Sequence, residues 1–380
     1  MRLKGFAALA AIVLASCSTT ATTPATDTAS MTSEDPYLWL EEVEGERALA
    51  WVREQNQRSL AVLEGDPRFA QLHRDAVALA NTRDRLPLGA VREGYYYNFW
   101  QDETHVRGIW RRSRLADYAR GQPQWETLLD IDALASAENA NWVYKGTDCL
   151  EGTTRCMISL SDGGRDATVW REYDIAQRRF VEGGFVVPDA KSSVSWIDRD
   201  TLLVATDWGE GTMTESGYAF VVKRWARGTP LASATEVMRG QAGDVGVFVG
   251  ALEDTDGRRL PIAVEADTFF ESINWRLDGA EPQRITLPRK ATVQGLYRGN
   301  LIVTLEEAWR GMPQGALIAY PLAESGAEAP NAAVLFAPGE RQSIEGVAIT
   351  NDAVLVAGFE NVRGRILRIA QEGGRWTTTQ

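Results

Sequence analysis

Serine and histidine are the first residues to consider for hydrolytic chemistry, because a serine nucleophile needs an imidazole base beside it. The 380-residue sequence contains two histidines, His73 and His105. No serine has a glycine two residues before it and another two residues after it, the pattern of the nucleophile elbow in α/β-hydrolases. His73 lies in a segment of helical period and His105 in a polar turn. Both are interpreted as surface or packing residues, and the sequence predicts no catalytic residue in this chain.

Two polar segments suggest ligand binding but have the wrong spacing. LSDGGRD (residues 160–166) lacks the Lys-Ser/Thr pair that ends a phosphate-binding loop. EDTDGRR (residues 253–259) resembles a calcium loop, but the first and twelfth ligand positions fall on Leu252 and Ala263. The cysteine and histidine spacing of zinc sites is also missing from the sequence. We therefore expect turns at both segments, and neither a metal ion nor a cofactor.

The N-terminus has the features of an export signal. Two basic residues precede an apolar run from Phe6 to Leu14, which is too short to span a bilayer. The run ends in Leu-Ala-Ser-Cys, which resembles the bacterial lipoprotein box, with Cys17 as the residue that would carry the diacylglyceryl group. The alternative is a plain signal peptide with an incidental cysteine. We expect a lipoprotein signal peptide over residues 1–17 and a flexible linker rich in Thr, Ala and Ser over 18–34.

Export would place the protein in the bacterial cell envelope, as a periplasmic lipoprotein held at the membrane by its lipid. Disulfides are possible in that compartment. Cys149 and Cys156 are seven residues apart, with Gly152 and two threonines between them. Two strands joined by such a turn bring the cysteines opposite each other, so the sequence favours a disulfide over two buried free thiols.

The charge of the chain limits its partners. The formal net charge is −12, with 44% hydrophobic and 24% charged residues. Phosphate backbones are bound through a local excess of Lys and Arg, so this balance argues against a general nucleic-acid-binding protein. The hydrophobic fraction is ordinary for a globular protein with a large core.

Two kinds of secondary structure follow the linker. Residues 35–84 have apolar residues at helical spacing, and Asp-Pro pairs at residues 35–36 and 66–67 predict the starts of two helices. From residue 85 to 380 the period changes to that of short strands separated by Gly, Asp and Asn. A unit of roughly 45–50 residues recurs, which is typical of propeller blades. The predicted units start near Gly89, Asn141, Ser193, Val245, Thr292 and Ser343.

The expected fold is therefore an all-β propeller of six to seven blades, with an incomplete last unit, preceded by a short two-helix segment. YYYNFWQDETHVRGIWRRS (residues 95–113) predicts a hairpin of the first blade. Its aromatic residues alternate between the two faces of a sheet, and its arginines can lie along aromatic rings. We interpret this segment as scaffold rather than as a site.

Several ordered segments resemble the prolyl oligopeptidase family of serine peptidases. DPYLWLEEVEGERALAWVREQN is similar to the family's N-terminal signature, and YYYNFWQDETHVRGIWRR and WETLLDIDALA to its first blade. Three further segments are similar to the family's second and third blades: NWVYKG, LSDGGRDATVWREYDI and SWIDRDTLLVATDWGEGTMTESGYAFVVKRWARGTPL. The resemblance covers the chain from about Asp35 to its end.

The resemblance implies a seven-bladed propeller and a C-terminal α/β-hydrolase domain that carries the catalytic Ser, Asp and His. In the family the propeller restricts access to short peptides, and cleavage after proline is the expected activity. The helical segment packs against the hydrolase domain. Because the nucleophile elbow is missing, we expect this chain to end before the catalytic domain and to be inactive alone. Its partners would be short proline-containing peptides, reached through that domain.

The resemblance also draws attention to the Gly-rich loop DWGEGTMTESGY, between two apolar strands. If this loop faces the peptidase domain, Trp208 and Glu210 are candidates for contact with substrate or with that domain. The alternative is a solvated loop whose Trp208 packs between blades. A second hypothesis for the whole chain is a free-standing propeller lipoprotein that acts as a binding scaffold in the cell envelope.

Overall fold

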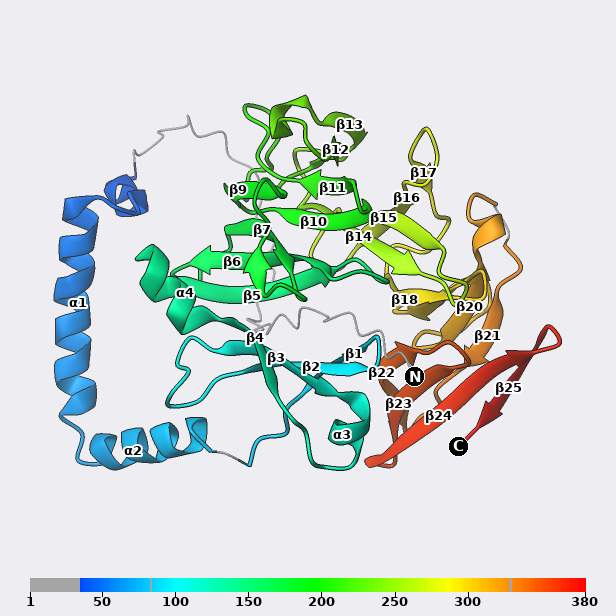
Figure 1. Ribbon diagram of the computed structural model, residues 1–380, viewed down its shortest axis with the longest axis horizontal. Helices are drawn as coiled ribbons and strands as arrows, with labels where there is room; N and C mark the ends of the chain where they lie inside the picture. Colours follow the sequence, from blue (N-terminus) through cyan, green and yellow to red (C-terminus); the bar gives the residue numbers. More distant parts are fainter. Residues whose placement is uncertain (1–34, 83, 328–329) are drawn as a thin grey trace, which may run out of the picture. The chain divides into compact units, whose positions relative to one another are not determined.

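The computed structural model describes residues 35–82, 84–327 and 330–380 (Figure 1). The predicted signal peptide and linker, with Cys17, lie outside the described residues. The described chain forms two compact units, a helical one that ends at Leu86 and a β unit over Pro87–Gln380. Of the helices in the described residues, none combines the length and the apolar character needed to cross a bilayer.

The helical unit contains, in its described residues, a short 3-10 helix (Leu38–Glu41) and two α-helices, α1 (Glu46–Glu64) and α2 (Phe69–Ala80). The two predicted helices are thus confirmed, but the first Asp-Pro pair precedes the 3-10 helix rather than α1. There the Asp35 carboxylate accepts a hydrogen bond from the Tyr37 N–H at 2.8 Å, whereas Asp66 accepts one from the Arg68 N–H at 2.9 Å just before α2. The apolar stripe of these helices is exposed at Leu60, Leu63, Leu72 and Leu79.

The described part of the β unit contains six antiparallel sheets that follow one another along the chain (Figure 1). The first strand of each lies within one residue of a predicted unit start, which confirms the repeat. The first sheet consists of β1 (Gly89–Arg92), β2 (Tyr95–Trp100), β3 (Ile109–Arg114) and β4 (Glu126–Asp130). The second consists of β5 (Trp142–Cys149), β6 (Arg155–Asp162), β7 (Thr168–Asp174), β8 (Arg179–Phe180) and β9 (Val186–Ala190). The third consists of β10 (Ser193–Asp198), β11 (Thr201–Ala205), β12 (Val221–Ala226) and β13 (Thr235–Arg239).

The remaining sheets have the same four-stranded order. The fourth consists of β14 (Gly246–Glu253), β15 (Arg259–Ala266), β16 (Ser272–Arg276) and β17 (Gln283–Arg284). The fifth consists of β18 (Ala291–Tyr297), β19 (Asn300–Leu305), β20 (Leu317–Pro321) and β21 (Ala333–Phe336). The sixth consists of β22 (Gln342–Ile349), β23 (Val354–Glu360), β24 (Arg363–Glu372) and β25 (Arg375–Thr379).

The expectation of an incomplete sixth unit is wrong, because that sheet has four strands. Its last strand, β25, has the sequence RWTTT, which lacks the alternating apolar residues that mark most other strands. It pairs with β24 through a tight hairpin at Gly373 and Gly374, where positive φ angles of 55° and 79° favour glycine. Backbone pairing, rather than apolar period, therefore makes this strand.

The sheets pack face to face over apolar clusters. One cluster joins the first two sheets and includes Tyr97, Trp110, Ile158 and Tyr173. In the first hairpin Tyr97 stacks on Trp110 with ring centroids 5.7 Å apart, and the Arg111 guanidinium lies 4.5 Å from the Trp100 ring and 4.1 Å from the Trp125 ring. These contacts show that the hairpin packs between the first two sheets, and two of its residues, Tyr97 and Trp110, also line the cavity described below.

Polar contacts tie neighbouring sheets together at the turns that follow their first strands. The Glu93 carboxylate accepts a hydrogen bond from the Gly152 N–H at 2.6 Å, which joins the first sheet to the second. The Asp254 carboxylate accepts one from the Gly299 N–H at 2.7 Å, which joins the fourth sheet to the fifth. Both glycines have positive φ, 72° and 76°, so the turn that presents each N–H favours glycine.

A buried carboxylate joins the second and third sheets. Glu172 on β7 is 1% exposed. It accepts hydrogen bonds from Arg227 at 2.8 and 3.1 Å and from the Phe185 N–H at 3.0 Å, and the Arg155 guanidinium lies 3.7 Å away. Removing one partner from such a buried, hydrogen-bonded ion pair destabilises the fold, because the remaining charge is left buried without compensation.

We predict that Glu172→Ala lowers the free energy of unfolding by roughly 3 kcal/mol. The measurement is urea denaturation followed by tryptophan fluorescence. Glu182→Ala, at an exposed position ten residues further along the chain, is the matched control and should change the free energy by less than about 0.5 kcal/mol. A loss below about 1 kcal/mol in Glu172→Ala would contradict this account of the network.

Cys149 ends β5 and Cys156 lies near the start of β6, directly opposite it in the register. The two residues form a disulfide, with a sequence separation of seven and Cα atoms 3.9 Å apart. Cys156 is fully buried. The bond closes the turn that carries Leu150, Glu151 and Gly152.

Cys149→Ser is predicted to lower the free energy of unfolding by roughly 2 kcal/mol, because the cross-link restricts a short loop of the unfolded chain. Urea denaturation with and without dithiothreitol measures the effect. The reductant should destabilise the unmodified protein and leave the variant unchanged. Equal midpoints for the unmodified protein under both conditions would refute the contribution of the disulfide.

Candidate functional site

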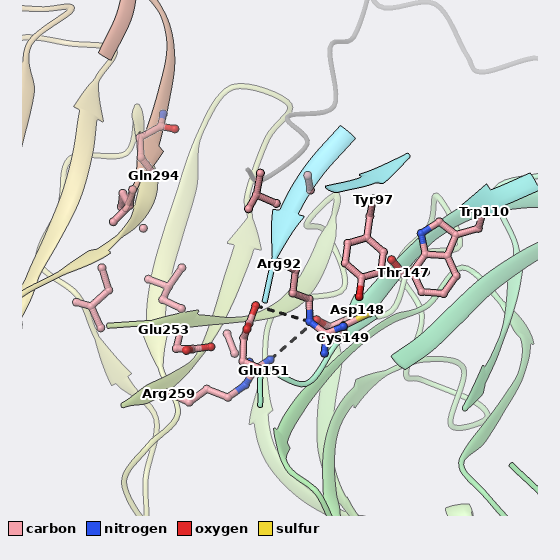
Figure 2. Close-up of a pocket in the computed structure, with 17 residues that line it drawn as sticks. Arg92, Tyr97, Trp110, Thr147, Asp148, Cys149, Glu151, Glu253, Arg259 and Gln294 are labelled. Carbon is pink, nitrogen blue, oxygen red and sulfur yellow. Dashed lines mark ion pairs between the residues drawn. The ribbon is translucent and has the colours of Figure 1, made fainter. Parts of the chain in front are cut away.

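The first strands of the sheets enclose a central cavity of about 260 Å³. Side chains from β1, β5, β14, β18 and β22 line it, so five of the sheets in the described chain contribute their innermost strand. The lining residues on these strands lie toward the strand ends, where the chain turns back into the second strand of each sheet. Tyr97 on β2, Trp110 on β3 and Arg259 on β15 also line the cavity. Figure 2 shows the charged and aromatic residues that face this space.

Two arginines and three carboxylates, those of Asp148, Glu151 and Glu253, line the cavity (Figure 2). Arg92 Nε lies 3.9 Å from a carboxylate oxygen of Glu151, and an Arg259 terminal nitrogen lies 3.9 Å from a carboxylate oxygen of Asp148. Both distances exceed the length of a hydrogen bond. These are ion pairs without a direct hydrogen bond, so each guanidinium keeps donors for other acceptors.

Arg92 is held by the backbone of the neighbouring sheet. One terminal nitrogen donates to the carbonyl oxygens of Leu150 and Thr153, at 3.1 and 2.5 Å. The side chain is 11% exposed and its guanidinium lies 6.0 Å from the centre of the Tyr97 ring. Its Nε is buried and has no hydrogen-bond acceptor among the described residues. The structure therefore fixes a cation at the cavity wall with one donor unused.

Asp148 lies near both arginines and connects three sheets. Its carboxylate accepts a hydrogen bond from the Trp196 N–H at 3.1 Å, and the Trp196 carbonyl accepts one from Arg259 Nε at 2.8 Å. Burial raises the pKa of the Asp148 carboxyl above its ordinary value, and this effect outweighs the opposing influence of Arg259, Trp196, Ser195 and Arg92.

A second hollow of about 430 Å³ adjoins the cavity at the turns after the first strands. It shares Glu151, Glu253 and Arg259 with the cavity and is otherwise lined by turn residues of the second, third and fourth sheets. The charged residues thus lie where the cavity meets the turns. The remaining cavity wall is largely apolar and includes Val91, Leu252, Leu296 and Ile349.

The predicted site residues Trp208 and Glu210 lie in the loop between β11 and β12 and do not line this cavity. Trp208 packs against the apolar clusters of the second to fourth sheets. Its indole N–H donates to the Val221 carbonyl at 3.0 Å, and the Lys223 ammonium lies 4.5 Å from the ring. Glu210 is exposed. This geometry agrees with the alternative interpretation of Trp208 as a packing residue.

The two histidines lie in different units. His73 is on α2 and stacks on Phe69, with ring centroids 5.9 Å apart. His105 lies between β2 and β3, and its Nδ1 is 3.1 Å from an Asp102 carboxylate oxygen. Hydrogen bonds, chiefly from the His105 backbone N–H, hold the pKa of Asp102 well below its usual range. Asp102 thereby shapes the turn after β2.

The charged cavity residues were not predicted from the sequence. A usable signal exists in the repeat: Arg92, Asp148 and Glu253 each lie at or next to the last residue of the first strand of a unit. In the described residues, no group of three or more His, Cys, Asp or Glu side chains is arranged to hold a metal ion. The arrangement is suited to binding a small ligand that has both a charged and an apolar part.

Comparison with known proteins places these features in a family. The profile described as "Prolyl oligopeptidase, N-terminal beta-propeller domain" matches residues 19–380. An uncharacterized peptidase of Sinorhizobium fredii is 38% identical over 364 residues, which are 92% of this chain and 50% of the relative. An uncharacterized peptidase of Rickettsia prowazekii is 26% identical over 360 residues, 89% of this chain and 50% of the relative.

Solved structures agree. A post-proline cleaving enzyme from Rickettsia typhi superposes with a TM-score of 0.81 at 26% identity, over 89% of this chain and 52% of that one. Prolyl oligopeptidase B from Galerina marginata has the same fold, with a TM-score of 0.65 at 16% identity, over 91% of this chain and 50% of that one. The chain spans about half the length of the curated relatives it matches. The family profile and the propeller it describes show that the chain belongs to the prolyl oligopeptidase family and contains its N-terminal β-propeller.

Proposed function

We propose that this chain is the access-restricting part of a peptidase that cleaves short peptides after proline. The observation that carries the proposal is the TM-score of 0.81, at 26% identity, with a post-proline cleaving enzyme over 89% of this chain. A hydrolase domain elsewhere in the complete enzyme would supply the serine nucleophile, its histidine base and the oxyanion hole. The propeller would decide which substrates reach them.

The dimensions of the cavity support a restricting role. A space of about 260 Å³ between packed sheets admits a few side chains of an extended peptide and is too small for a folded domain. The exposed leucines of α1 and α2 support a partner for the helical unit, because apolar helix faces are usually covered in a stable assembly. Leu63, Leu72 and Leu79 are 59%, 63% and 74% exposed.

We predict that the purified 380-residue chain does not hydrolyse a chromogenic proline-containing octapeptide, because its sequence lacks the nucleophile elbow. When this chain is mixed with the C-terminal half of the Sinorhizobium relative, the mixture should cleave after proline. Its activity should favour the octapeptide over an unfolded protein substrate by at least about tenfold.

The C-terminal half alone is the control and should cleave both substrates with little discrimination. Turnover by the purified chain alone would contradict the assignment of chemistry to another domain. Equal rates on the short peptide and the unfolded protein in the mixture would contradict the gating role.

We further propose that Cys17 carries a lipid that holds the protein at the envelope membrane. The support is the placement of Cys17 directly after the apolar run, in a Leu-Ala-Ser-Cys sequence. The lipid would replace the cleaved signal peptide as the membrane attachment, and the Thr-, Ala- and Ser-rich residues 18–34 would act as its tether.

Metabolic labelling of expressing bacteria with an alkyne fatty acid tests this anchor. We expect the unmodified chain to take up the label and to sediment with membranes, whereas Cys17→Ser, which lacks the thiol that would carry the lipid, should lose roughly nine-tenths of the label or more. Cys149→Ser is the matched cysteine control and should keep the label. Equal labelling of Cys17→Ser and the unmodified chain would refute the anchor.

A further inference from the structure

We propose that the central cavity binds the carboxylate of a small ligand with an apolar side chain, and that Arg92 and Arg259 hold this carboxylate. The C-terminal carboxylate of a short peptide is the ligand we assign to it. That identification rests on the proposed peptidase function, whereas the carboxylate site itself rests on the geometry of the cavity.

Both arginines have N–H donors that are free to bind a carboxylate. Arg92 uses one terminal nitrogen for two backbone carbonyls, and its buried Nε has no acceptor among the described residues. Arg259 uses Nε for the Trp196 carbonyl, and one of its terminal nitrogens lies 3.9 Å from the Asp148 carboxylate, beyond hydrogen-bond length. A buried donor without an acceptor is costly, and a carboxylate oxygen satisfies it with a charge-assisted hydrogen bond.

Both guanidinium groups are already held in place before a ligand binds. The side chains of Arg92 and Arg259 are 11% and 15% exposed, and each is anchored to a backbone carbonyl of a neighbouring sheet. Little side-chain entropy remains to be lost when a ligand binds. Figure 2 shows the two guanidinium groups approaching the same space from different strands.

An apolar wall beside the arginines can bind the side chain of the ligand. Val91, Leu252, Leu296 and Ile349 line the cavity beside the charged residues. A volume of about 260 Å³ suits one or two amino-acid residues with aliphatic side chains. The combination selects a ligand with a charged end and an apolar body, which describes the C-terminus of a short aliphatic peptide.

The carboxylates of the protein set the pH dependence of binding. Asp148 faces Arg92 and Arg259, and Glu151 and Glu253 also line the cavity. Burial already raises the pKa of Asp148, and an incoming carboxylate raises it further. Protonation of Asp148 removes a negative charge beside the ligand, and the raised pKa of Asp148 lies above the pKa of about 3.5 of a peptide carboxylate, which stays ionised. Binding should therefore strengthen as the pH falls through the raised pKa of Asp148.

Isothermal titration of the purified 380-residue chain tests the site with three probes: N-acetyl-Ala-Val with a free C-terminus, the same peptide amidated, and isobutyrate. We expect one molecule of the free-acid peptide to bind, and the amide to bind at least about tenfold more weakly. Binding of isobutyrate with the free-acid peptide confirms a carboxylate site that free acids also reach. Binding of isobutyrate alone overturns the peptide assignment.

Neighbouring arginines provide a matched pair of variants. Arg259→Gln should weaken binding of the free-acid peptide by about tenfold or more, whereas Arg258→Gln should leave it unchanged. The Arg258 side chain is 53% exposed, pairs with Asp254 and does not line the cavity. Circular dichroism confirms that each variant is folded.

Asp148→Asn supplies a readout that a merely structural role would not change. It should strengthen binding at pH 8 severalfold and remove the pH dependence, and it keeps the proposal testable if Arg259→Gln does not fold. Equal binding of acid and amide, no binding of either, or a loss of affinity in Asp148→Asn would overturn the site. None of the probes contains proline or is cleaved, so the result is independent of the outcome of the peptidase reconstitution.

Discussion

A four-stranded sheet with apolar residues on both faces is unstable alone, and this constraint governs the whole β unit. The first and second sheets share one apolar cluster, the third and fourth another, and the fifth and sixth a third. Each sheet therefore depends on its neighbours for burial, as in other repeat architectures. The hydrogen bonds between Glu93 and Gly152 and between Asp254 and Gly299 make this packing more specific, because each fixes the position of one sheet against the next.

The same constraint creates the cavity. Stacked sheets that share a centre bring their first strands together, and the residues at the ends of these strands meet although they are far apart in the sequence. Arg92 and Arg259 are separated by 259 − 92 = 167 residues, and both lie near Asp148. Charges in such a place are partly desolvated, so their interactions with each other and with a ligand are stronger than at an exposed surface.

Local sequence patterns were sufficient to predict most elements of the fold. Turn residues between apolar runs located the start of each sheet to within one residue, and helical spacing located α1 and α2. The last strand was underestimated because Trp376 is the only large apolar residue in RWTTT, and pairing with β24 rather than apolar period forms it. The extra strand β9 was likewise missed, because it pairs with β7, fifteen or more residues earlier, instead of with a sequence neighbour.

The candidate site was less predictable, for a physical reason. Which residues face the centre depends on how whole sheets stack, and no short segment encodes that. Trp208 shows the ambiguity of a single residue: a large aromatic residue in a Gly-rich loop fits binding or packing, and here its indole N–H donates to the Val221 carbonyl and its ring packs on neighbouring clusters.

The disulfide described above links the covalent state of the chain to this central space. Cys149 and Cys156 close the turn in which the carbonyl oxygens of Leu150 and Thr153 accept hydrogen bonds from the Arg92 guanidinium. A molecule that folds with both thiols reduced has no covalent restraint on the turn that holds Arg92. The redox conditions during folding would then affect the position of the Arg92 guanidinium in the cavity.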